Sequence, residues 1–159
     1  MGYVVTCEEL LKLVCEDRSA GKTLALANGC FDLLHVGHLR YLVGAALEAD
    51  RLIVAVNDDE SVTMLKGRGR PIIPSTERAE ILAAFRVVDY VVLFSGETVS
   101  DLLDAIKPDV HCKGTDYTVE SVPEREIVRR YGGRTAIVGD QKNRSTHDLL
   151  IQIVNSIGR

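Results

Sequence analysis

The amino-acid sequence predicts an α/β domain in which helices cover both faces of a five-stranded parallel sheet. Three observations lead to this fold class. Five short apolar runs recur along the chain, amphipathic helical patterns separate them, and 46% of the 159 residues are hydrophobic. Apolar runs without alternation are typical of strands buried between two layers of helices. A chain of this length and composition buries one sizeable core, so we expect residues 1–159 to form a single domain.

The first predicted element is a leading helix over residues 6–20, with Thr6 and Glu9 in capping-box spacing at its start. A core over residues 22–153 follows, and each short apolar run in it predicts a buried strand. The predicted strands are residues 23–29, 51–57, 87–94, 108–114 and 134–140.

Periodic apolar positions predict helices between and after these strands. In the helix that follows the first strand, the predicted apolar face consists of Val36, Leu39, Leu42 or Val43, and Ala46 or Leu47. Residues 58–74 predict a helical turn and then a loop rich in glycine, proline and basic residues. The other predicted helices are residues 75–85, 98–106, 122–133 and 144–158. Because crossovers between parallel strands are right-handed, this alternation predicts a Rossmann-like, doubly wound sheet.

Charge and cysteine content exclude several classes of partner. The formal net charge is −4, so no overall positive field attracts nucleic acid or an anionic membrane surface. No apolar run approaches the ~20 residues that cross a bilayer, and the N-terminus lacks the pattern of a signal peptide. The cysteines show no CxxC spacing, so we expect reduced thiols in a cytoplasmic protein. They are Cys7, Cys15, Cys30 and Cys112.

Two histidines, His35 and His38, flank Gly37 where the first strand of the core gives way to a helix. In a parallel α/β sheet, ligands bind beyond the carboxyl ends of the strands, where helix N-termini present backbone N–H groups. Two imidazoles there can donate hydrogen bonds to phosphate oxygens during substitution at phosphorus. Gly29 and Gly37 lack a Cβ and would let an anion approach the backbone. The alternative for each histidine is a hydrogen-bonded structural side chain.

The stretch GCFDLLHVGHLRYL resembles the HxGH signature of the cytidylyltransferase-like nucleotidyltransferases, which transfer a nucleoside monophosphate to a phosphorylated acceptor and release pyrophosphate. With LIVAVNDDESV, LKGRGRPIIP, VDYVVLF and PDVHCKGTDY, it resembles the branch that makes ADP-heptose from ATP and D-glycero-D-manno-heptose 1-phosphate. The resemblance implies a stand-alone adenylyltransferase, ATP and a sugar 1-phosphate as partners, a homodimer, and heptose supply for a bacterial surface glycan such as lipopolysaccharide.

Roles at the nucleotide follow from the resemblance. It implies that His35 and His38 stabilise the pentacoordinate α-phosphorus and that Lys66 is a third catalytic residue. The implied nucleotide-binding residues are Asn28, Gly29, Cys30, Phe31, His35, Gly37, His38, Arg144, Ser145 and Thr146. Ser145 and Asp148 also have capping-box spacing, so an alternative role for Ser145 is to cap the final helix.

Roles at the acceptor follow in the same way. The implied substrate-binding residues are Asp32, Asn57, Asp59, Lys66, Arg70, Arg78, Lys113, Gly114 and Asp116. Arginine suits bidentate contact with phosphate and lysine a point-charge contact, whereas Arg68 on the same loop is expected to be solvated. The alternative for Arg78 is an ion pair on the helix surface with Glu77 or Glu80.

No group of histidines and carboxylates has the spacing of a protein metal site. We therefore expect a divalent ion, most simply Mg²⁺, to ride on the ATP triphosphate. Two other functions remain open from the sequence. One is a cytidylyltransferase that acts on glycerol 3-phosphate or a similar alcohol phosphate, and the other is a nucleotide-binding sensor without turnover.

Overall fold

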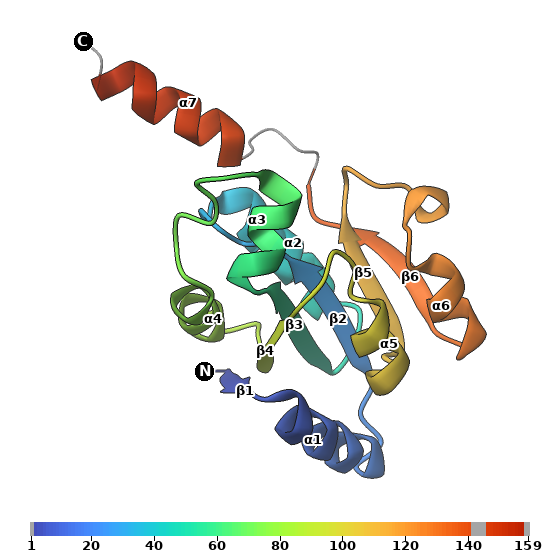
Figure 1. The fold of residues 1–159 in the computed structure, drawn as a ribbon. Coiled ribbons are helices and arrows are strands. Elements are labelled where there is room, and N and C mark those ends of the chain that lie inside the picture. The colour runs from blue at the N-terminus through green and yellow to red at the C-terminus, as the bar shows by residue number, and fades with distance from the viewer. Residues whose placement is uncertain (1, 141–145, 158–159) are drawn as a thin grey trace.

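A six-stranded parallel sheet lies at the centre of the computed structural model, which describes residues 2–140 and 146–157 (Figure 1). The order of the strands is β1-β4-β3-β2-β5-β6, and every neighbouring pair runs parallel. The strands are β1 (Tyr3–Val5), β2 (Leu24–Gly29), β3 (Arg51–Asn57), β4 (Tyr90–Phe94), β5 (Val110–Gly114) and β6 (Arg134–Val138). The predicted Rossmann-like, doubly wound class is confirmed.

The prediction of five strands is wrong by one, because β1 was not foreseen. Its three residues pair with Tyr90–Val92 of β4 at the edge of the sheet. A segment of three residues carries too little periodicity to predict a strand. The pairing with β4, which follows it by more than 80 positions, makes these residues a strand.

The helices are α1 (Cys7–Ser19), α2 (Val36–Ala46), α3 (Asp59–Lys66), α4 (Ser75–Ala83), α5 (Ser100–Ile106), α6 (Arg125–Arg130) and α7 (Thr146–Ile157), with a 3₁₀ turn at Val119–Ser121. The predicted capping box at the start of α1 is confirmed, since Glu9 N donates to Thr6 Oγ1 and Thr6 N donates to Glu9 Oε2. None of the helices in the described ranges is long and apolar enough to cross a membrane.

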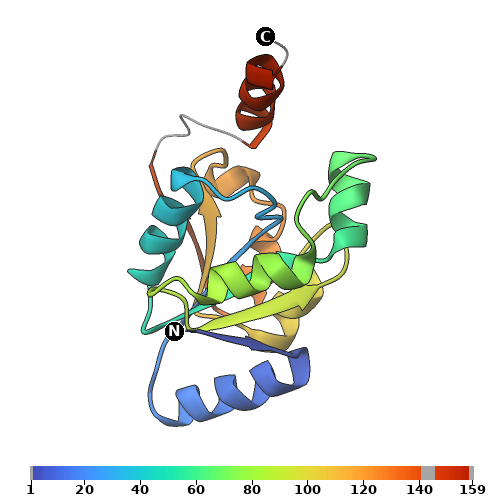
Figure 2. The same cartoon turned by 90° about the vertical axis from the view of Figure 1, so that its left-hand side faces the viewer.

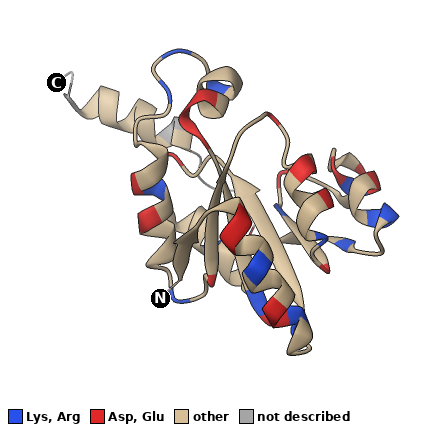
Figure 3. Ribbon diagram, turned by 60° about the horizontal axis from the view of Figure 1, so that its bottom comes forward, with Lys and Arg blue, Asp and Glu red and all other residues tan. Residues whose placement is uncertain are grey.

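Each face of the sheet packs against its own helices. Leu42 of α2 and Leu82 of α4 belong to the core on one face, and Leu10 of α1 and Leu103 of α5 to the core on the other. The views in Figures 1 and 2 place α1 at the bottom of the molecule and α7 at the top. Acidic and basic residues are interspersed over the helices, whereas the strands carry few of either (Figure 3).

The predicted apolar face of α2 is confirmed at Leu42 but is wrong at its other large apolar positions. Leu42 and Ala45 are its buried residues, while Val36, Leu39 and Leu47 are exposed. The helix is apolar on more than one side, so periodicity alone does not select the side that faces the sheet.

Candidate functional site

The order of the strands defines one crevice at the carboxyl edge of the sheet. From β2 the chain runs to β3 and β4 on one side, and then returns to β5 and β6 on the other. Ligands of doubly wound sheets bind at such a switch point, here between β2 and β5. Asn28 near the end of β2 and Lys113 near the end of β5 flank it, since the preceding residues Ala27 and Cys112 are paired in register.

The two histidines form the start of α2. His35 is the N-cap residue and its Nδ1 accepts from Gly37 N at 3.1 Å, while His38 Nδ1 accepts from His35 N at 3.3 Å. The ring centroids are 3.9 Å apart. Because Nδ1 is the acceptor in each ring, a neutral ring carries its proton on Nε2. The structural and the catalytic interpretations are therefore compatible, since they use different nitrogens.

Gly37 is required by this cap. A Cβ at position 37 would lie 2.9 Å from His35 Nδ1, a distance that real Cβ atoms do not show. Phe31 lies beside His38: it is 3% exposed, and its ring centroid is 5.4 Å from that of His38. The Phe31 side chain thus belongs to the core. The contact with the nucleotide that the resemblance implies would therefore be made by the Phe31 backbone.

Asp32 anchors the basic loop. Its side chain is 2% exposed, and its carboxylate accepts from Arg70 Nε at 2.5 Å, from Ile72 N at 2.8 Å and from Ile73 N at 3.0 Å. Both carboxylate oxygens thus bind the chain itself, a contact that sequence reasoning missed. The pairing places Arg70 beside the loop that carries the histidines. Lys66, at the end of α3, is exposed.

Arg78 is fully buried on the side of α4 that faces the sheet. The predicted alternative, a surface ion pair with Glu77 or Glu80, is therefore wrong. A buried guanidinium is tolerated only where its donors have partners. Three of its four partner residues lie 19 or more positions away in the sequence, so the pattern around position 78 gives no sign of them.

The Arg78 guanidinium holds the carboxyl ends of β2 and β3 together. Nη1 donates to the carbonyl oxygens of Cys30 and Asn57, Nη2 to Asp59 Oδ1 at 2.7 Å, and Nε to the Ile73 carbonyl at 2.9 Å. These contacts account for four of its five N–H groups.

Burial raises the pKa of the Cys30 thiol, although the positive charge of Lys66 acts in the opposite direction. This cysteine is therefore unsuited to act as a nucleophile.

A buried polar group lies beside the crevice at β5. Lys113 Nζ is 3.3 Å from Asn28 Oδ1 and 3.6 Å from Glu124 Oε2, and it lies 5.0 Å from the centre of the Tyr117 ring. His111 Nε2 is 3.0 Å from the same Asn28 oxygen. Sequence reasoning missed His111 and Glu124, because the pattern around His111 predicts only a strand and the pattern around Glu124 only a helix.

The remaining predicted residues lie around this edge. A Cβ at Gly114 would meet Asp116 Oδ1 at 2.9 Å, so the glycine gives that carboxylate room. Thr146 Oγ1, at the start of α7, donates to the Leu33 carbonyl at 3.3 Å and so brings this helix to the histidine loop. Arg144 and Ser145 lie outside the described residues. Within 2–140 and 146–157, no group of three or more His, Cys, Asp or Glu residues is arranged to hold a metal ion.

Comparisons with known proteins show which family the chain resembles. The model of the family described as Cytidylyltransferase-like matches residues 26–155. The chain is 43% identical over 152 residues to "Bifunctional protein HldE" of Syntrophotalea carbinolica and 44% identical over 153 residues to that of Pseudomonas fluorescens. These matches cover 95% and 96% of the chain but 31% and 32% of the relatives, so the chain spans about a third of their length.

Among solved structures, the chain is similar to the lipopolysaccharide core biosynthesis protein from Thermoplasma volcanium. The TM-score is 0.64 at 25% sequence identity. The match covers 77% of this chain and 100% of that one.

Proposed function

The chain belongs to the cytidylyltransferase-like family, the nucleotidyltransferases with an HxGH signature, and we propose that it transfers AMP from ATP to a heptose 1-phosphate to give ADP-heptose and pyrophosphate. The observation that carries this proposal is the pair of imidazoles at the start of α2, whose ring centroids are 3.9 Å apart. Each Nδ1 accepts from a backbone N–H, which places the proton of a neutral ring on Nε2. The KGRGRP and KGTDY segments and the similarity to a lipopolysaccharide core biosynthesis protein support a sugar phosphate as acceptor.

In the proposed reaction, an oxygen of the acceptor phosphate attacks the α-phosphorus of ATP in line. The new O–P bond forms as the bond to the β-phosphate oxygen breaks, and pyrophosphate leaves with that electron pair. The acceptor phosphate is already anionic, so no strong general base is needed. Positioning and charge stabilisation supply the rate.

Each residue has a role that depends on the phosphate group that it would contact. His35 and His38 donate to oxygens of the α-phosphate, and the Thr146 end of α7, with Arg144 and Ser145, meets the triphosphate. Lys66 and Arg70 neutralise pyrophosphate, and the acceptor phosphate lies near Lys113 and the ends of β3 and β5. Mg²⁺ enters as part of the MgATP substrate and keeps several of its waters.

We also propose a homodimer and a cytoplasmic location. An exposed apolar stripe runs along α2 and its C-cap residue, and it consists of Val36, Leu39, Val43 and Leu47. Contiguous exposed apolar surface is typical of interaction sites. The four cysteines are free thiols, which fits a reducing compartment. Sedimentation of the full chain measures its oligomeric state directly.

The test of the proposed function crosses ATP, CTP, GTP and UTP with both anomers of heptose 1-phosphate and with glycerol 3-phosphate, in the presence of Mg²⁺. Released pyrophosphate is the readout. We expect pyrophosphate with ATP and a heptose 1-phosphate. Release only with CTP and glycerol 3-phosphate would contradict the proposal, and so would nucleotide binding without release in any combination.

A further inference from the structure

Lys113 is unusual among the charged residues of the sheet. The six strands contain three charged side chains, and Arg51 and Arg134 each stand at the first position of their strand. Only Lys113 lies toward the carboxyl end, where the crevice is, and its side chain is 9% exposed. An ammonium with so little access to water requires a counter-charge nearby.

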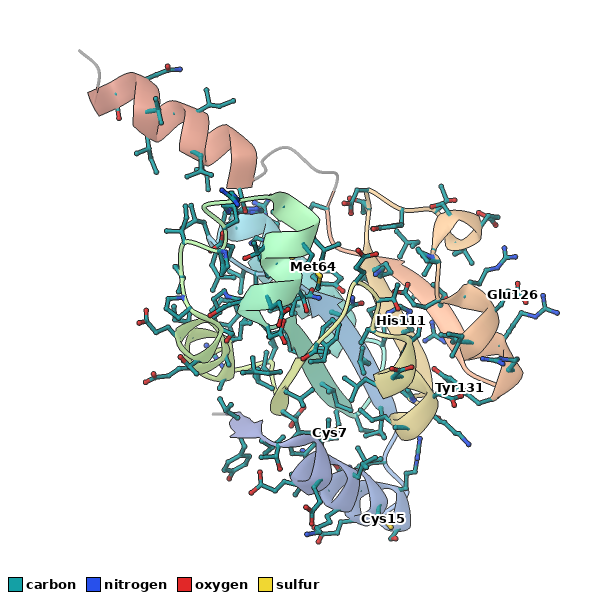
Figure 4. All side chains as sticks on the ribbon, viewed as in Figure 1. Cys7, Cys15, Met64, His111, Glu126 and Tyr131 are labelled. Carbon is teal, nitrogen blue, oxygen red and sulfur yellow. The ribbon has the colours of Figure 1, made fainter. Side chains whose placement is uncertain are left out.

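Glu124 supplies this counter-charge from the residue before α6. Its side chain is 4% exposed, and Oε2 is 3.6 Å from Lys113 Nζ. Among the described residues, this oxygen has no hydrogen-bond partner. Its neighbour Glu126 is exposed on α6 and pairs with Arg125 (Figure 4). Burial of the Glu124 carboxylate costs solvation free energy, and the nearby charge that offsets this cost is the Lys113 ammonium.

The Lys113 ammonium in turn fixes the orientation of the Asn28 carboxamide. An ammonium only donates, so the Asn28 atom that it contacts at 3.3 Å is the oxygen. His111, inside the sheet (Figure 4), contacts the same oxygen through Nε2 at 3.0 Å. With the oxygen held by two donors, the carboxamide presents its NH₂ group on the other side of the planar amide.

We propose that Glu124 is a positioning residue, which holds the Lys113 ammonium at the crevice between β2 and β5 so that Lys113 and the Asn28 NH₂ group meet a substrate phosphate together. The inference rests on the proposed function, since it assigns Lys113 a phosphate to neutralise. This role differs from that of a purely structural ion pair, because Glu124 must affect activity through the position of Lys113.

The test is a double-mutant cycle in the full chain with Glu124→Gln, Lys113→Met and both together, and with Glu126→Gln as the matched control. We expect Glu124→Gln to lower kcat/KM for heptose 1-phosphate about 10- to 100-fold, the scale of one charge-assisted contact. The Glu126→Gln variant should stay within about twofold of wild type. The double variant should match Lys113→Met, because Glu124 has nothing left to position.

Two results would overturn the inference: a folded Glu124→Gln variant with wild-type kcat/KM, or losses that multiply in the double variant. Thermal unfolding reports whether each variant folds. Should Glu124→Gln fail to fold, Glu124→Asp replaces it, because it keeps the charge on a shorter side chain and is expected to lose activity while folded.

A readout without substrate separates this inference from the proposed function. The ¹⁵NH₂ signal of Asn28, assigned with Asn28→Asp, should move in Glu124→Gln and remain in place in Glu126→Gln. If wild type makes no ADP-heptose but the signal moves, the function fails and the positioning by Glu124 stands. If wild type is active and the signal does not move, the positioning role is wrong.

Discussion

Among single residues, His38 carries most of the proposed chemistry. Its Nδ1 accepts from the His35 backbone, which fixes the ring and directs its Nε2 proton to act as a donor. We expect His38→Ala to lower kcat about 10²- to 10³-fold, the scale of one lost transition-state donor. The accompanying loss of the cap should cost only about 1 kcal/mol, so the variant should fold, as thermal unfolding would check. Near-wild-type turnover in a folded variant would exclude the role.

His111 links stability to pH. Burial, with a smaller effect of the Lys113 charge, lowers the pKa of His111 from 6.5 to about 3. Between these values the unfolded chain binds a proton that the folded chain does not. The free energy of unfolding therefore decreases as the pH falls from 6.5 toward 3, by up to about 1.4 kcal/mol per pH unit.

Urea unfolding at pH 7.5 and pH 5.5 measures this linkage. The His111→Gln variant should lose less stability than wild type between the two pH values, because glutamine does not titrate. Equal losses in both proteins would mean that His111 is protonated about as easily in the folded chain as in the unfolded chain.

At the scale of elements, Asp32 connects the histidine loop to the basic loop. In Asp32→Asn, the new NH₂ group faces Arg70 Nε, donor against donor, and the charge-assisted contact is lost. We expect faster amide hydrogen exchange at Ile72 and Ile73 and a several-fold higher KM for the substrates. Asp50→Asn is the control, because Asp50 binds Thr23 at the opposite end of the sheet. Unchanged exchange at both isoleucines in Asp32→Asn would contradict the anchor.

Sequence reasoning foresaw elements where the signal is local. The capping box of α1 and five strands follow from short-range patterns, and so does the place of His35 and His38 at a strand–helix junction. It failed where the determining contact is distant. Strand β1 forms because it pairs with β4. Arg78 is buried where it donates a hydrogen bond to the Cys30 carbonyl, 48 positions away. Glu124 contacts Lys113 only after folding.

For the whole molecule, the order of the strands explains why these residues meet. The chain leaves β2 in one direction and returns beside it as β5, so the ends of both strands border one crevice. The histidines at the start of α2 follow β2, the basic loop is anchored by Asp32, and Lys113 lies near the end of β5. A polyphosphate and a second phosphate can thus share one edge of the sheet.

The transfer of the α-phosphorus tests this account most directly. ATP labelled at the α-phosphate with ³²P is incubated with the full chain, Mg²⁺ and heptose 1-phosphate, and a parallel reaction contains ATP labelled at the γ-phosphate. We predict that the α-label moves into a nucleotide–sugar and that the γ-label appears in pyrophosphate. The account is contradicted if the γ-label moves to the sugar, or if the α-label stays in free adenine nucleotides while the protein binds ATP.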